Sequence, residues 1–150
     1  MVFILIKWFF LAVAGTLVPA IVLNVEKKLL IPVGIGGGLG YLIAVAATPN
    51  FGIPGFIQVF FGAVVVGLLS EMMARIFKSP TLTFCIPGIF PLVPGISAYK
   101  TMQLLAEQEW RDAASTGLMT AASAFAIAFG LMLMAAMFRH IPKKKMAVKS

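Results

Sequence analysis

The residues best suited to bind a solute lie in one short stretch, where three prolines interrupt an apolar run. Pro87, Pro91 and Pro94 are spaced four and three residues apart, so they fall on one face of a helix. A proline in a helix has no N–H to donate, and its ring clashes with the carbonyl four residues earlier. The spacing therefore predicts that the carbonyl groups of Thr83, Pro87 and Phe90 lose their usual helical partners.

Such a break could build a binding site for a small charged solute. Unpaired carbonyls are costly in hydrocarbon, so this face should contact protein or water. Gly95 begins a second helical segment with Ser97 in its first turn, and helix N-termini attract anions. Broken helices of this kind form binding sites in secondary transporters. The candidate solute-binding residues are Pro87, Pro91, Pro94, Gly95, Ile96, Ser97 and Tyr99. The other interpretation is a kinked structural helix whose neighbours complete the hydrogen bonds.

Glu71 is an acidic residue within an apolar stretch, one helical turn before Arg75. An acid inside a membrane span is a candidate for proton coupling. The nearby arginine and the position close to the end of the stretch favour a structural ion pair instead. No group of His, Cys and acidic residues has metal-ligand spacing, and no nucleophile has a recognisable base and orienting group. We therefore expect no metal, no cofactor and no enzymatic activity.

These residues belong to a chain that is apolar almost throughout. Hydrophobic residues make up 61% of the 150 and charged residues 11%, with a mean hydropathy of +1.02. This balance is typical of a membrane protein, and the apolar runs are long enough to cross about 30 Å of hydrocarbon as helices. We predict an all-α integral membrane protein with one membrane domain, residues 1–138, and a basic cytoplasmic tail, residues 139–150. Its five predicted spans are about 2–23, 29–47, 54–74, 81–99 and 113–138, the fourth broken by the prolines.

The basic residues predict how these spans are oriented. With five spans, nine of the twelve Lys and Arg residues fall on the side of the first loop, the third loop and the tail. The positive-inside rule then places the N-terminus outside and the C-terminus in the cytoplasm. A re-entrant loop at residues 81–99 would move the basic tail outside, so a crossing is favoured. The tail itself fits anionic lipid better than nucleic acid, because it directly follows a span.

Two of the predicted spans carry faces suited to close helix packing. The second contains two overlapping G-x-x-x-G spacings, which let a neighbouring backbone approach closely. The fifth carries small residues spaced three and four apart. The candidate packing residues are Gly34, Gly36, Gly38, Gly40, Gly117, Ala121 and Ala124. Two such faces in five spans indicate an oligomer or a second membrane subunit.

The block IPGIFPLVPGISAYKTM, preceded by the charged turn RIFKSP, closely resembles the small subunit of the split form of the threonine/serine exporter family. The resemblance extends over nearly the whole chain. It implies a bacterial cytoplasmic membrane protein that works with a larger membrane subunit. It also implies threonine and serine as substrates, or a dicarboxylate such as succinate for the split form. The residues that carry the match are Pro87, Pro91, Pro94, Gly95, Ser97, Ala98 and Tyr99.

The sequence leaves two main functions open. The first is one half of a secondary exporter for small carboxylate-bearing metabolites, driven by the proton motive force because the chain has no nucleotide-binding motif. The second is a scaffold that does not transport but stabilises the larger subunit, with the prolines as a docking kink. A pore formed by copies of this chain is a third possibility, and it predicts solute leakage without any partner.

Overall fold

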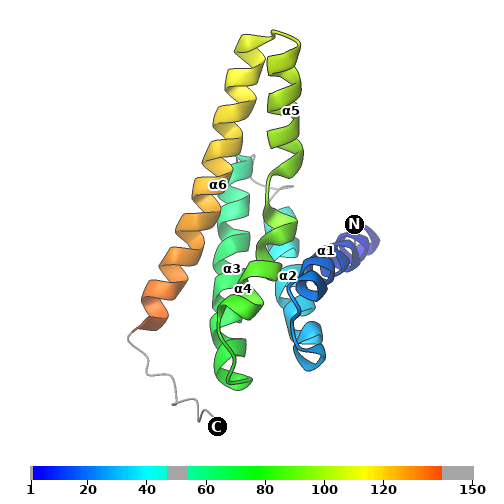
Figure 1. The fold of residues 1–150 in the computed structure, drawn as a ribbon, viewed down its shortest axis with the longest axis vertical. Coiled ribbons are helices and arrows are strands. Elements are labelled where there is room, and N and C mark those ends of the chain that lie inside the picture. Colours follow the sequence, from blue (N-terminus) through cyan, green and yellow to red (C-terminus); the bar gives the residue numbers. More distant parts are fainter. Residues whose placement is uncertain (1, 47–53, 140–150) are drawn as a thin grey trace.

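The computed structural model of the protein describes residues 2–46 and 54–139, and these residues form helices joined by short turns, without a strand (Figure 1). Four helices are long and apolar enough to cross a membrane, and a bent pair could supply a fifth crossing. The predicted all-α membrane protein is therefore confirmed. The helices are α1 (Val2–Val22), α2 (Leu30–Ala46), α3 (Gly55–Ile76), α4 (Leu82–Ile89), α5 (Gly95–Ala106) and α6 (Trp110–Arg139), with single 3₁₀ turns η1 (Lys27–Leu29) and η2 (Phe90–Leu92).

The central helix is α2, which packs against α1, α3 and α4. Its glycines make this possible, because they let neighbours approach the helix from several sides. Gly37 lies against Thr16 of α1, while Gly40 lies against Val66 of α3. A methyl group added at Gly62 of α3 would lie only 2.9 Å from the carbonyl oxygen of Gly40, so the two backbones are nearly in contact.

Helices α3 and α6 run parallel to each other. A methyl group added at Gly130 would lie 3.1 Å from the Cβ of Ala63, and further along Arg75 contacts Phe138. Positions therefore advance together along the two helices. Because α3 and α6 run in the same direction, the segment between them must pass from one end of the bundle to the other. The α4–α5 unit thus crosses the bundle rather than returning to the end where it began.

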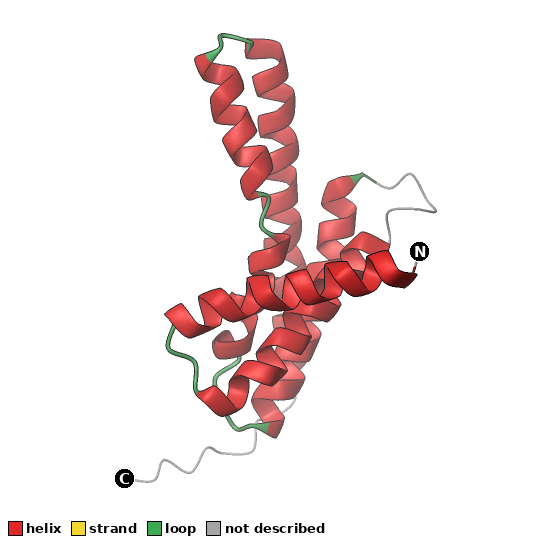
Figure 2. Ribbon diagram, turned by 90° about the vertical axis from the view of Figure 1, so that its right-hand side faces the viewer, coloured by secondary structure: helices red, strands yellow, loops and turns green. Residues whose placement is uncertain are grey.

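The crossing unit is bent by 51° between residues 82–92 and 95–106. Beyond the bend, α5 packs mainly against α6, and the two helices rise past the rest of the bundle as a hairpin (Figure 2). Both helices continue through charged sequence that we expected to form a loop, so only residues 107–109 separate them. Good helix formers and a 2.9 Å hydrogen bond from Gln103 to Glu107 explain this extension.

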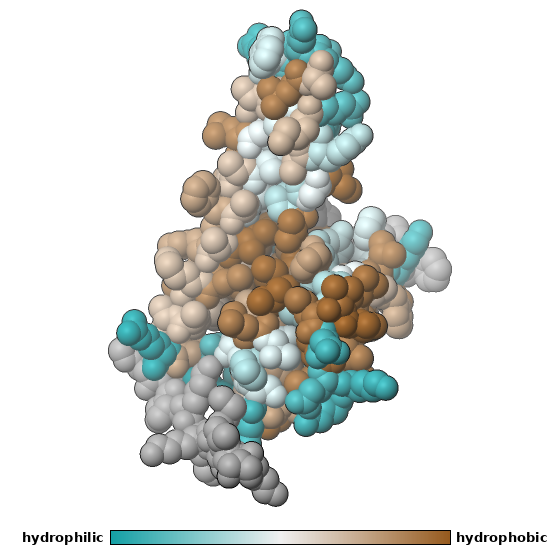
Figure 3. Space-filling model, viewed as in Figure 1, coloured by the Kyte–Doolittle hydropathy of each residue, from teal (hydrophilic) through white to brown (hydrophobic). Residues whose placement is uncertain are grey.

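Two small cores hold the bundle together. One joins α1, η1, α2, α3 and α4 at the end that carries Lys28, Arg75 and Lys78, which we call the basic end. The other lies around Val66 and Leu92 in the middle of the bundle. Large apolar side chains elsewhere are exposed, and Figure 3 shows them as a hydrophobic region between hydrophilic ends. This arrangement suits a protein whose sides face lipid and not water.

Candidate functional site

The first part of the proline block lies inside the bundle. Pro87 is buried in α4, and Leu92 belongs to the middle core. Gly88 approaches α2 so closely that an added methyl group would lie 4.0 Å from the Cα of Gly37. Pro91 faces α1, where it lines a cavity of about 190 Å³ together with Trp8 and Tyr41.

The carbonyl groups at the break are not left without partners, which corrects the sequence prediction. The N–H of Phe90 donates to the carbonyl of Pro87, and the N–H of Val93 donates to the carbonyl of Phe90 at 3.3 Å. The N–H of Gly95 donates to Val93 at 2.8 Å. In the first two bonds, 3₁₀ geometry lets the donor reach back three residues instead of four, whereas the N–H of Gly95 reaches back only two residues across a γ-turn at Pro94. Two of the three carbonyls that we expected to be free therefore already accept hydrogen bonds.

The second part of the block faces away from the bundle. Ile96 is 86% exposed and Tyr99 is 72% exposed, while a side chain at Gly95 would meet nothing within 4 Å. Ser97 is half-buried, and its carbonyl accepts a 2.8 Å hydrogen bond from the hydroxyl of Thr101. The candidate residues are therefore divided between an inner pair, Pro87 and Pro91, and an outer group that begins at Gly95. Pro94 lies between them, directly before α5. The chain alone does not enclose them in one cavity.

Glu71 lies in a small polar cluster at the basic end, and it is only 8% exposed. The hydroxyl of Thr81 donates a 3.1 Å hydrogen bond to its Oε1, and Nη2 of Arg75 lies 3.9 Å from its Oε2. Thr81 immediately precedes α4, so the carboxylate connects α3 to the start of the broken unit. Sequence analysis identified the arginine but missed the threonine, because that contact depends on how two helices are placed side by side.

Arg75 extends the same cluster to a third helix. Its Nη2 donates a 3.1 Å hydrogen bond to the carbonyl of Phe138, and its guanidinium lies 5.1 Å from the centre of the Phe138 ring. A cation at the last turn of a helix is favourable because unpaired carbonyls gather there. The Glu71 cluster, defined as Glu71, Arg75, Thr81 and Phe138, thus joins α3, α4 and α6 at one end.

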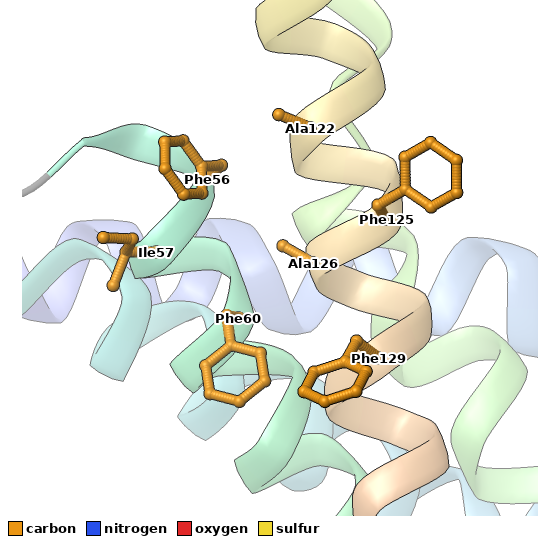
Figure 4. A pocket seen from close by; sticks show the side chains of 7 residues that line it. All are labelled: Phe56, Ile57, Phe60, Ala122, Phe125, Ala126 and Phe129. Atoms are coloured by element: carbon orange, nitrogen blue, oxygen red, sulfur yellow. The ribbon is translucent and has the colours of Figure 1, made fainter.

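An apolar groove of about 420 Å³ opens between α3 and α6 above their closest contact (Figure 4). The rings of Phe60 and Phe129 stack at its base with centroids 6.0 Å apart. Higher up, Ala122 and Ala126 face Phe56 and leave space between the helices. All seven lining residues are apolar, so this groove has no side chain to hold a charged solute.

The predicted packing residues have different surroundings. A methyl group at Gly34 would lie 3.2 Å from Val13 of α1, and one at Gly38 would lie 2.7 Å from the same side chain. Gly36 has more room, since its nearest neighbour would be the sulfur of Met73 at 3.9 Å. On α6, Gly117 faces Thr101 of α5, whereas two other small residues are exposed. These two are Ala121 and Ala124.

The sequence matches the model of one known protein family. The family model described as Threonine/Serine exporter, ThrE, matches residues 8–137, which include most of α1, nearly all of α6 and everything between them. The chain belongs to the threonine/serine exporter family. This confirms the family that the proline block indicated. No curated protein and no solved structure gave a match. The match makes this exporter-family chain a multi-pass membrane protein of the transporter class.

The family match includes both candidate sites. Three residues of the Glu71 cluster lie inside the matched range, and Phe138 lies one residue beyond it. The whole proline block lies inside the matched range. The basic tail lies mostly outside the described residues, since residues 140–150 are not described. The features that this exporter-family chain can use for solute transport are therefore the broken unit, the cluster at its start and the cavities beside it.

Proposed function

We propose that the chain is one subunit of a secondary exporter that moves small carboxylate-bearing metabolites out of the cytoplasm, together with a larger membrane subunit. The observation that carries the proposal is the open start of α5. Gly95 has empty space beside it, and Ile96 and Tyr99 point away from the bundle, directly after a break in the middle of an apolar helix unit. A second subunit placed against this turn would complete a site with a helix N-terminus facing the solute.

The solute we propose is threonine or serine, or a dicarboxylate such as succinate. We place the protein in the bacterial inner membrane, with its N-terminus outside and its basic end and tail in the cytoplasm beside anionic lipid. The net charge of +7 and the gathering of basic residues at one end support this orientation. Glu71 is the candidate for proton coupling, because it is buried and contacts the start of the broken unit.

The decisive experiment is export of labelled threonine and labelled succinate from cells that express this chain, the larger subunit, or both. We expect export only from cells with both, and the exported compound names the substrate. Gly95→Leu and Ser97→Ala should lower flux while the two subunits still copurify, because Gly95 has space for a side chain and Ser97 is only half-buried. Export that is unchanged when this chain is absent would refute a transport role.

One observation favours the scaffold as the second candidate function. The carbonyls of Pro87 and Phe90, which we expected to lack helical partners, accept backbone hydrogen bonds instead. A scaffold needs only the shape of the bend. It would tolerate Ser97→Ala without loss of flux, and changes on the exposed face of α5 would act by releasing the larger subunit.

A further inference from the structure

A second polar site lies at the basic end, away from the proline turn. The turn between α1 and α2 and the turn between α3 and α4 enclose a cavity of about 380 Å³, which we call the turn pocket. Ligand cavities commonly measure about 300 to 1,000 Å³, so the turn pocket can hold a metabolite of a few carbon atoms. The two turns are held together beneath it by the core around Leu29 and Phe84.

The lining of the turn pocket is amphipathic. Leu29 and Ile86 supply apolar walls, while Asn24, Ser79 and Thr83 supply an amide and two hydroxyls. The hydroxyl of Ser79 donates a long, 3.4 Å hydrogen bond to the carbonyl of Phe77, and it must release this bond to bind a solute. Amides and hydroxyls donate hydrogen bonds, which suits the oxygen atoms of a carboxylate. The Phe-lined groove between α3 and α6 has no such groups, so the turn pocket is the better place for a polar solute.

The charges around the turn pocket indicate which solute it takes. Glu26 lines the pocket, and its Oε2 forms a 2.6 Å ion pair with the Nζ of Lys28. Lys27 and Lys78 are next to lining residues in the sequence, since Lys27 follows Glu26 and Lys78 precedes Ser79, and they add positive charge to this end of the bundle. A solute with one carboxylate and one ammonium group finds a partner for each. A dicarboxylate would bring its second negative charge beside Glu26, which is unfavourable.

The turn pocket also lies at the beginning of the broken unit. Thr83 and Ile86 are on α4, just before Pro87. Away from the pocket, earlier in α1 and later in α4, Thr16 and Pro87 are fully buried and Gly37 approaches Gly88. We call this packed region the closed layer. The cavity beside Pro91 lies past this layer. In alternating access, a transporter passes through a state in which the cavities on its two sides are not connected. Two cavities separated by packed protein fit that state.

We propose that the turn pocket is the site where solute first docks from the basic end, and that it takes a small zwitterionic amino acid in preference to a dicarboxylate. This inference rests on the proposed export function. Ser79, Thr83 and Asn24 hold the carboxylate, and Glu26 holds the ammonium group. The closed layer above the pocket keeps the solute from passing further until the helices move.

The kinetic test uses the complex of this chain with the larger subunit, reconstituted in lipid vesicles. Thr83→Val and Ser79→Ala should each raise the KM for threonine by about tenfold with little change in maximal rate, because each removes one hydrogen bond to the carboxylate. Glu26→Gln should weaken threonine transport and improve the relative transport of succinate. The matched controls are Thr120→Val and Ser123→Ala, whose hydroxyls bond to their own helix. Equal KM values in the pocket variants and the controls would overturn the proposal.

A labelling test reports binding even when the vesicles do not transport. Thr83→Cys in a Cys85→Ala background should react with a water-soluble maleimide, and threonine should slow the reaction more than succinate does. Equal protection by succinate would overturn the amino-acid preference. Protection by vesicles rich in anionic lipid, without protection by threonine, would make the turn pocket a headgroup site and overturn the proposal. Protection by threonine together with absent transport would refute the proposed export function and leave the pocket standing.

Discussion

At the scale of single residues, Glu71 makes contacts that stabilise the fold, and we propose that the same contacts serve proton coupling. Its carboxylate accepts a hydrogen bond from Thr81 and lies near Arg75, so it has the partners that a stable buried acid needs. The same partners connect it to the start of the broken unit. A proton taken up here would weaken the attraction to Arg75 and the hold on α4, which is what a coupling residue must do.

Replacing Glu71 by Gln separates these two roles. The amide oxygen can still accept the hydrogen bond from Thr81, whereas the charge that faces Arg75 is lost. We expect a stability loss of about 1 kcal/mol, and export that no longer responds to a proton gradient. Thermal unfolding in detergent and export with and without an uncoupler measure the two effects. Gradient-driven export at the normal rate in the Gln variant would leave Glu71 with a structural role only.

Thr81→Val tests the hydrogen bond by itself. The valine has nearly the same shape but cannot donate to Glu71, so a buried carboxylate oxygen loses a partner. We expect the protein to lose about 1 to 3 kcal/mol of stability, seen as earlier unfolding of the purified complex. Thr120→Val is the control, because its hydroxyl bonds only to the carbonyl of Thr116 on its own helix. Equal melting of both variants would contradict the role given to Thr81.

At the scale of helices, the sequence predicted the position of the break but not its internal bonding. Three prolines in fourteen residues are enough to end a helix. The hydrogen bonds across the break depend on whether the chain tightens into 3₁₀ turns, and proline spacing alone does not decide that. The sequence also underestimates the length of α5. Charged residues such as Lys100 predict the end of a span, although they form helices well.

The glycines of α2 give a matched test of helix packing. Gly40 faces Val66 and the carbonyl of Gly62, so Gly40→Ala should push α3 away and cost about 1 to 3 kcal/mol. Gly36→Ala lies on the same helix but has room for a methyl group, so it should be neutral or stabilise the helix by up to about 1 kcal/mol. Melting curves of the two variants measure the difference. Similar melting temperatures would show that α2 and α3 do not pack as described.

At the scale of the whole molecule, the parallel directions of α3 and α6 fix the relation between the two ends. The α3–α4 turn and the end of α6 meet at the Glu71 cluster, while the α5–α6 turn lies at the far end of the hairpin. Apolar length predicted helices long enough to cross a membrane, and the described residues contain four of them and a bent pair that could supply a fifth crossing. The hairpin's projection past the other helices was not predictable, since it depends on where α3 meets α6.

Single cysteines at the two ends test this arrangement in the membrane. In a Cys85→Ala background, Lys78→Cys should react with an impermeant thiol reagent only from the cytoplasm, and Glu109→Cys only from outside. We expect this because the α4–α5 unit and α6 each cross the bilayer once in the proposed orientation. Intact cells and inverted vesicles supply the two sides of the measurement. Reaction of both positions from one side would mean that the bent unit re-enters and does not cross.

The length of α6 has one more consequence. Its 30 residues measure about 45 Å as a helix, whereas the hydrocarbon layer is about 30 Å thick. A tilt of the usual size does not absorb this difference, so we expect the hydrophilic tip of the α5–α6 hairpin, at the top of Figure 3, to extend beyond the hydrocarbon. This tip is connected through α5 to the Pro91–Gly95 segment. In the proposed orientation the tip lies outside the cell, so we expect an antibody fragment bound to it to restrict movement of that segment and to block export.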